Sequence, residues 1–159
     1  MIIRNLLKHF IIVLFIFLID RISKQLVIYF DGHNSNSEIF LSKFLNIQLI
    51  WNDGVAFGLF ASDNIFYYHS LTGFIILIIV ILIFFSIKTN GLEKYSFIII
   101  LGGSLGNVYD RLIYSAVPDF IDIHYQSFHW FIFNVADIFI TTGVLLLIYI
   151  ELVLKNKKS

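Results

Sequence analysis

Two aspartates in the C-terminal third of the sequence have the setting that acid–base chemistry requires. Asp137 lies in FNVADIFITTG, residues 133–143, where most other residues are apolar. An ionised carboxylate in hydrocarbon costs several kcal/mol, so a chain keeps one only where it is paired, hydrated or used. Asp119 follows Pro118, which fixes the local backbone, so we expect a bend that presents Asp119. Two carboxylates a few Å apart share a proton, and such a pair can activate water and protonate a carbonyl oxygen.

The sequence alone leaves two candidates for the partner of Asp137. The loop after the third apolar segment can bring Asp119 to Asp137, whereas Asp122, three residues further on, can occupy the same space if the bend runs differently. His124 and His129 lie close by, and we expect both at the surface without a catalytic role. The chain has no cysteine, and a carboxylate pair needs neither a metal nor a cofactor.

Helical spacing predicts two further polar groupings. Asn134 precedes Asp137 by three residues and Thr141 follows it by four, so the three share one face, with Asp137 about two turns into the fourth apolar segment. Asp20 and Lys24 are four residues apart and are predicted to pair near the outer end of the first apolar segment.

Two arginines also fall at the edges of apolar segments. Arg21 is expected to point away from its charged neighbours and to reach lipid headgroups. In GGSLGNVYDR, residues 102–111, the glycines allow another backbone to approach closely, and Asn107, Asp110 and Arg111 share one face. Arg111 is then a partner of Asp110, a headgroup contact or an organiser of other carboxylates.

The segment FLNIQLIWNDGVAFGLF, residues 44–60, predicts a small sheet. Its β-branched and aromatic residues surround Asn-Asp-Gly, a pattern typical of a strand, a tight turn at Asn52 to Gly54 and a second extended piece. An ordinary hairpin explains Asn52 and Gly54. The functional interpretation is that the Asn52 amide reaches toward the membrane and grips a peptide backbone.

The composition indicates that these residues are positioned by membrane helices. Of 159 residues, 58% are hydrophobic and only 14% are charged, whereas soluble domains carry about a quarter charged residues. A net charge of zero gives no reason to expect nucleic acid as a partner. Four apolar segments are each long enough to cross a bilayer and together form a single membrane domain. They lie near residues 6–29, 65–87, 95–113 and 131–154.

Basic residues predict the orientation of these segments. Two lie at the start of the first segment, two in the loop at 88–94 and three after the fourth segment. They are Arg4, Lys8, Lys88, Lys94, Lys155, Lys157 and Lys158. Lysine and arginine accumulate on the cytoplasmic side, so both termini should be cytoplasmic and residues 30–64 and 114–130 should lie outside. The predicted fold class is an all-α polytopic membrane protein with four transmembrane helices and a small β-sheet cradle on the outer side.

Five motifs, taken in order, resemble those of the bacterial lipoprotein signal peptidases, the type II signal peptidases. They are D-x-x-x-K at 20–24, NDGVAFG at 52–58, GGSLGNVYDRL at 102–112, VPDFID at 117–122 and FNVAD at 133–137. The resemblance extends over nearly the whole chain. Ser115 and Pro118 depart from the family pattern, which concerns only the path of the 113–119 turn.

The resemblance implies an aspartyl endopeptidase of the bacterial inner membrane that has no cofactor or metal. Its substrates would be prolipoproteins, cut on the amino side of a diacylglyceryl-modified cysteine, and its partners would include membrane lipids and the cyclic peptide inhibitor globomycin. Asp119 and Asp137 would form the catalytic pair. The substrate-binding and supporting residues would be Asp20, Lys24, Asn52, Gly54, Asn107, Arg111, Asn134 and Ala136.

A small transporter or proton channel is the alternative, because buried aspartate, arginine and lysine residues also mark ion pathways. The ionisable residues gather at one face of the membrane instead of forming a series across it. This distribution favours the peptidase.

Overall fold

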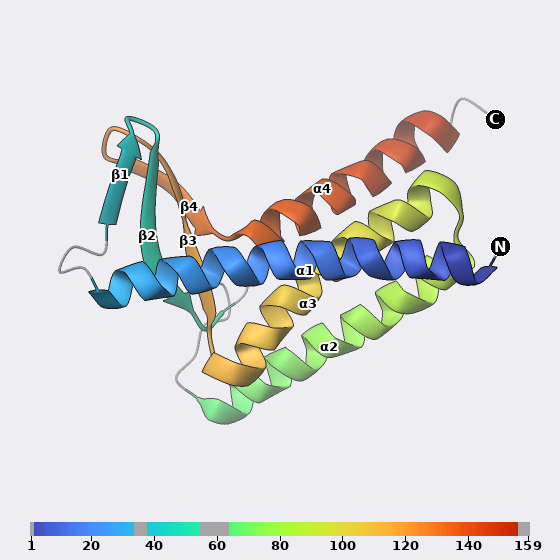
Figure 1. Ribbon diagram of the computed structural model, residues 1–159, viewed down its shortest axis with the longest axis horizontal. Coiled ribbons are helices and arrows are strands. Elements are labelled where there is room, and N and C mark those ends of the chain that lie inside the picture. Colours follow the sequence, from blue (N-terminus) through green and yellow to red (C-terminus); the bar gives the residue numbers. More distant parts are fainter. Residues whose placement is uncertain (1, 34–37, 55–63, 156–159) are drawn as a thin grey trace.

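The computed structural model describes residues 2–33, 38–54 and 64–155. Within these residues, helices form a bundle and a sheet extends from one end of it (Figure 1). The elements are α1 (Ile2–His33), β1 (Glu38–Ser42), β2 (Leu45–Asn52), α2 (Ile65–Lys88), α3 (Gly91–Tyr114), β3 (Val117–Tyr125), β4 (Phe128–Phe133), α4 (Val135–Tyr149) and the π-helical segment η2 (Ile150–Lys155). The prediction of a helical chain with a small β-sheet is confirmed, and the sheet is antiparallel.

Helix α3 is the centre of the bundle, since it packs against α1, α2 and α4. Its glycines permit this close packing. A Cβ added to Gly103 would lie 2.5 Å from the carbonyl oxygen of Ala136 on α4, and one added to Gly106 would overlap the carboxylate of Asp20 on α1. The predicted role of the glycine motif is therefore confirmed.

Two helical stretches within the described residues, Ile65–Lys88 and Val135–Leu154, are long and apolar enough to cross a membrane. Helices α1 and α3 carry charged residues in their C-terminal halves, which lowers their apolar character. These charged side chains are buried within the bundle, among them Asp20, Lys24 and Asp110, each with no exposed surface. The bundle therefore hides from its surroundings the charges that interrupt these two helices.

The sheet has the strand order β1-β2-β3-β4 and every pair is antiparallel. The strand predicted before Asn52 is β2, and the chain bends at residues 53 and 54 directly after it. The hairpin turn of the described sheet lies at residues 43 and 44, between β1 and β2, and β2 pairs with β3 as far as Asn52 opposite Val117. The predicted second extended piece, from residue 55, lies outside the described residues.

The segment after α3 forms a hairpin, and the expected loop and bend are wrong. Strand β3 follows two residues after α3, and β4 returns beside it. Along β3 the buried Phe120, Asp122 and His124 alternate with more exposed neighbours, as a strand requires. Pro118 is accommodated in β3 because the described pairing with β4 begins only at Ile121.

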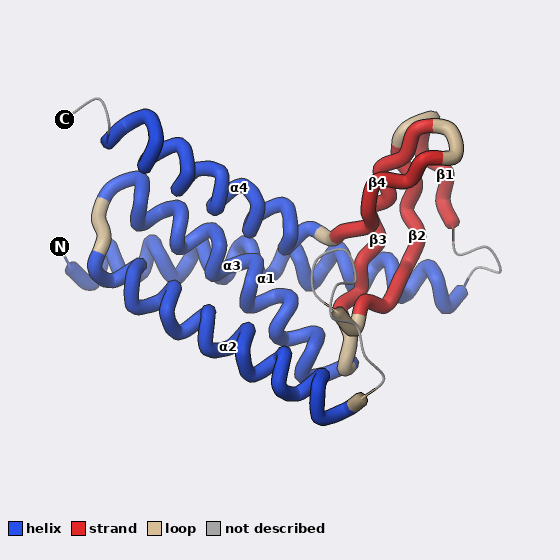
Figure 2. The backbone as a smooth tube through the Cα atoms, turned by 180° about the vertical axis from the view of Figure 1, so that it is seen from behind, coloured by secondary structure: helices blue, strands red, loops and turns tan. Residues whose placement is uncertain are grey.

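The last helix starts later than expected. We expected the fourth apolar segment to begin at residue 131, but β4 extends to Phe133, so α4 starts at Val135. Asp137 is consequently in the first turn of α4 and not about two turns into it. The start of α1, the α2–α3 connection and the end of η2 all lie at the end of the bundle opposite the sheet (Figure 2).

Candidate active site

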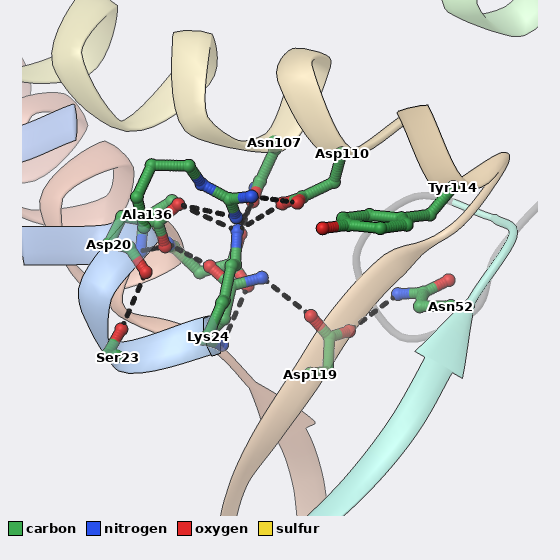
Figure 3. Close-up of polar contacts among 12 residues, drawn as sticks. Asp20, Ser23, Lys24, Asn52, Asn107, Asp110, Tyr114, Asp119 and Ala136 are labelled. Atoms are coloured by element: carbon green, nitrogen blue, oxygen red, sulfur yellow. Dashed lines mark hydrogen bonds and ion pairs between the residues drawn. The ribbon is translucent and has the colours of Figure 1, made fainter. Parts of the chain in front are cut away.

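Polar residues from each of the five motifs meet where the sheet joins the helical bundle. Figure 3 shows side chains from α1, α3, β2 and β3 turned toward one another beside the start of α4. Among the largest fully buried side chains are Lys24, Asn134, Asp20 and Asp110. Because these side chains are buried, their hydrogen bonds and ion pairs with one another define the geometry of the cluster.

Asn134 joins the two candidate carboxylates. Asn134 is the N-cap of α4. Its side-chain oxygen accepts a hydrogen bond from the backbone N–H of Asp137 at 3.1 Å, and its backbone N–H donates to Asp137 Oδ2 at 3.1 Å. The Asn134 side-chain nitrogen donates to Asp119 Oδ1 at 2.6 Å. A capping box that begins the helix thus also holds the carboxylate of β3 beside that of α4.

Asp119 receives a second amide from the opposite side. Asn52 Nδ2, at the end of β2, donates to Asp119 Oδ2 at 2.8 Å, and only 5% of Asp119 is exposed. Burial is the largest cause that raises the pKa of Asp119, and the nearby Asp137 carboxylate also raises it, whereas the hydrogen bonds from Asn52 and Asn134 lower it, so that the pKa lies at about 6. A carboxyl group with this pKa can exchange a proton near neutral pH.

Asp137 is held from α3 through Asn107. Asn107 Nδ2 donates to Asp137 Oδ1 at 2.9 Å, and Asn107 Oδ1 accepts from Lys24 Nζ at 2.8 Å. Because an ammonium group can only donate, Lys24 fixes which end of the Asn107 amide faces Asp137. Lys24 therefore positions this carboxylate from a distance, through Asn107.

Lys24 is the centre of a buried charge cluster. Its ammonium group contacts Asp20 Oδ2 at 2.9 Å and Asp110 Oδ2 at 2.7 Å, so the predicted Asp20–Lys24 pair is confirmed. Asp20 Oδ1 also accepts a hydrogen bond from the amide of Ala136 at 3.0 Å. This carboxylate satisfies a free N–H at the start of α4, where negative charge is favourable.

The two arginines differ from expectation. Arg21 does not point away from its charged neighbours, because its guanidinium lies 2.6 Å from Asp110 Oδ1 and 3.5 Å from Asp20 Oδ2. Arg111 donates to the backbone carbonyls of Gly54 and Asp53, a role that none of the three predictions included. Helical spacing did not predict the contacts of Arg21 with Asp110 or of Arg111 with Gly54, because each contact joins two different segments of the chain.

Asn52 and Gly54 are held by contacts within the chain. While Asn52 Nδ2 bonds to Asp119, Asn52 Oδ1 accepts the amide of Gly54 at 2.9 Å. Gly54 is buried and its carbonyl receives Arg111. The end of β2 is therefore fastened both to Asp119 and to α3, and the expected grip on a peptide backbone stays a prediction.

Asp122 lies apart from this network. Its Oδ2 atom is 2.8 Å from His129 Nδ1, a contact within the β3–β4 hairpin. His129 is exposed as predicted, but His124 is buried, because it follows Asp122 on the covered face of β3. Within the described residues, Asp119 is the carboxylate that shares Asn134 with Asp137.

An open pocket adjoins Asp119. It has a volume of about 380 Å³, and its walls come from the end of β2 and from β4. They comprise Ile50, Trp51, Asn52, Asp53, Asp119, Trp130, Phe131 and Ile132. A buried carboxylate at the wall of a mainly apolar pocket has the form of a site that binds an extended apolar ligand.

Comparison with known proteins identifies the family. Residues 12–153 match the model of a family described as signal peptidase (SPase) II. The chain belongs to the signal peptidase II family. Members of this family are peptidases, so the chain is a protease, and the family match favours this function over a transporter or channel.

Individual relatives agree over almost the full length. The chain is 47% identical to the lipoprotein signal peptidase of Pelagibacter ubique (strain HTCC1062), over 98% of this chain and 94% of that protein. It is 38% identical to the lipoprotein signal peptidase of Francisella tularensis subsp. novicida (strain U112), over 97% of both chains. The aligned length therefore spans the positions of all five motifs, from α1 to α4.

Solved structures support the fold. One, described as a bacterial membrane enzyme structure by the in meso method at 2.3 Å resolution, matches with a TM-score of 0.75 and 29% identity. The match covers 96% of this chain and 91% of the chain in that structure. A second, similarly described at 1.9 Å resolution, matches with a TM-score of 0.72 and 28% identity. This signal peptidase II is accordingly a bacterial membrane protein.

Proposed function

We propose that this signal peptidase II is an aspartyl endopeptidase that removes the signal peptide from diacylglyceryl-modified prolipoproteins, with Asp119 and Asp137 as the catalytic pair. The observation that carries the proposal is the set of hydrogen bonds from Asn134 to both carboxylates. One rigid helix start thereby fixes two acids from different elements. The raised pKa of Asp119, about 6, supports a pair that divides one proton between its members.

The chemistry follows from one ionised and one protonated carboxyl group. The ionised member accepts a proton from a water molecule as the water oxygen attacks the scissile carbonyl carbon. The protonated member donates its proton to the carbonyl oxygen, which gives a tetrahedral diol. Transfer of a proton to the amide nitrogen then breaks the carbon–nitrogen bond and releases the lipidated cysteine with a free amino group.

The surrounding residues position the pair. Asn52 and Asn134 direct N–H groups at Asp119, and Asn107 directs one at Asp137, so each carboxylate is oriented before substrate arrives. Lys24 orients Asn107 in turn. We assign Asp20, through its bond to the Ala136 amide, the role of fixing α4 against α1.

The pocket beside Asp119 supplies the proposed binding surface for the peptide. Trp51 and Trp130 on its walls are partly exposed, 44% and 67%, so they can cover apolar residues of a signal peptide. Globomycin, a cyclic peptide, would compete for this surface. Lipid chains of the substrate add about 0.8 kcal/mol per buried methylene, so an unlipidated precursor should be cut much less efficiently.

The proposal also includes how the chain is placed in the membrane, where its helices contact lipid. All four helices would cross the membrane, because the charges near the sheet end of α1 and α3, such as Lys24 and Asp110, are buried, and apolar side chains such as Phe15 and Leu77 face outward. The bundle end that carries Arg4, Lys8, Lys88 and Lys94 would be cytoplasmic, with both termini, which places the sheet and the carboxylates outside.

Orientation can be tested directly because the chain contains no cysteine. We would place a single cysteine at Thr89, between α2 and α3, or at Gln126, in the β3–β4 turn. A membrane-impermeant maleimide applied to intact cells stripped of their outer membrane should label Gln126→Cys alone. Labelling of Thr89→Cys alone would reverse the proposed orientation.

A further inference from the structure

A cluster of metal-ligating side chains lies on the β3–β4 hairpin, outside the proposed catalytic pair. It comprises Asp122, His124 and His129, and one potential ligand atom from each lies within 4.8 Å of the other two. His124 and His129 are direct partners across the two strands, and their rings stack with centroids 5.2 Å apart. The hairpin register therefore brings two imidazoles and one carboxylate to a single point.

Two of these groups have polar atoms that the chain leaves unsatisfied. Asp122 is fully buried, yet its Oδ1 atom has no hydrogen-bond partner. The side chain of His124 is 8% exposed, and its Nδ1 atom also has no hydrogen-bond partner. A buried carboxylate oxygen and a buried ring nitrogen without partners are costly in free energy unless something else binds them.

The distances suit a small cation. Asp122 Oδ2 is 2.8 Å from His129 Nδ1 and 3.8 Å from His124 Nδ1. Oxygen and nitrogen ligands about 2.0–2.2 Å from a tetrahedral ion lie roughly 3.4 Å apart, a value between the two. Small movements of the exposed His129 ring would therefore make room for an ion. The side chain of His129 is 52% exposed, which leaves an entry path from solvent.

We propose that Asp122, His124 and His129 bind a divalent transition-metal ion of the Zn²⁺ class, with water at the remaining coordination position. Two imidazoles with one carboxylate favour Zn²⁺ over Mg²⁺ and Ca²⁺, which prefer oxygen ligands. The ion ties β4 to β3 on the strand that also carries Asp119, so it stabilises the hairpin whose β4 strand forms part of the pocket. It takes no part in peptide hydrolysis.

The test uses the full chain, purified in detergent without a polyhistidine tag and treated with a chelator. Isothermal titration with ZnCl₂ should show one bound ion per chain, and Co²⁺ substitution should give the visible absorption of a tetrahedral site. His129→Gln changes an exposed side chain and so preserves folding, whereas Asp122→Asn is isosteric. Each variant should weaken Zn²⁺ binding by more than ~100-fold, because even outer-shell changes cost about 10- to 100-fold.

His33→Gln is the matched control, since His33 is exposed in the last turn of α1 and lies outside the cluster. It should bind Zn²⁺ as the unmodified chain does. Bound Zn²⁺ should also raise the melting temperature of the unmodified chain but not that of His129→Gln. Absence of stoichiometric Zn²⁺ binding in the unmodified chain, or equal binding by His129→Gln, would overturn the proposal.

Discussion

Replacing Asn134 by serine should change the electrostatics of the carboxylate pair without disturbing the start of α4. The serine hydroxyl can still accept the amide of Asp137 as an N-cap, so the helix start is retained. It cannot replace the side-chain N–H that reaches Asp119 at 2.6 Å. The variant therefore removes one donor from one carboxylate and leaves the architecture in place.

The magnitude follows from the strength of that hydrogen bond. A hydrogen bond to a charged group contributes about 1.5–3 kcal/mol, and each pKa unit corresponds to about 1.4 kcal/mol. The bond favours the ionised form of Asp119, so its loss raises the pKa of that group above about 6. The acid limb of the pH profile should move upward by about 1–2 pH units, and activity at pH 7 should fall by roughly two- to tenfold.

The assay is the pH dependence of kcat/KM on a lipidated peptide, with Asn134→Ala as a second variant. The alanine variant loses the same donor and also the cap, so its acid limb should move equally while its stability falls by about a further 1 kcal/mol. An unchanged acid limb in well-folded Asn134→Ser protein would refute the assigned role of Asn134.

Three further predictions concern stability. Because the folded-state pKa of Asp119 is raised from 3.8 to about 6, the folded chain holds this proton more tightly and stability falls as pH rises between these values. Melting in detergent should show about 3 kcal/mol of this pH dependence, and Asp119→Asn should remove it. Lys24→Met strands two buried carboxylates and should cost about 3–5 kcal/mol, measured as lost folded yield and melting temperature, whereas Lys88→Met, at the end of α2, should be near neutral. Gly106→Ala should disrupt folding because its methyl group overlaps a carboxylate on α1, whereas Gly73→Ala, with open space around it, should stabilise by about 0.5–1 kcal/mol.

The sequence predicts best those features that depend on local spacing. Asp20 and Lys24 pair because four residues make one helical turn, and the glycines of α3 meet neighbouring backbones because no side chain fills the space. The separation of helices from a small sheet also follows from apolar length and β-branched content. Each of these properties is set within one segment.

Features that depend on partners from other segments were not predictable in the same way. Asp110 lies beside Arg111 in sequence, yet it pairs with Lys24 and Arg21 from α1, because helix packing and not adjacency decides the contact. The β3–β4 hairpin was missed because Pro118 suggested a bend. A strand at that place shifted the start of α4 to Val135 and brought Asp137 to its first turn.

The most direct test of the catalytic pair is cleavage of a diacylglyceryl-modified prolipoprotein peptide by the purified chain in detergent. The unmodified protein should cut on the amino side of the lipidated cysteine, and folded Asp119→Asn and Asp137→Asn proteins should not. Asp122→Asn, which alters another buried carboxylate of β3, should retain measurable cleavage. Persistent cleavage by Asp119→Asn or Asp137→Asn, or complete loss in folded Asp122→Asn, would contradict the assignment of Asp119 and Asp137 as the catalytic pair.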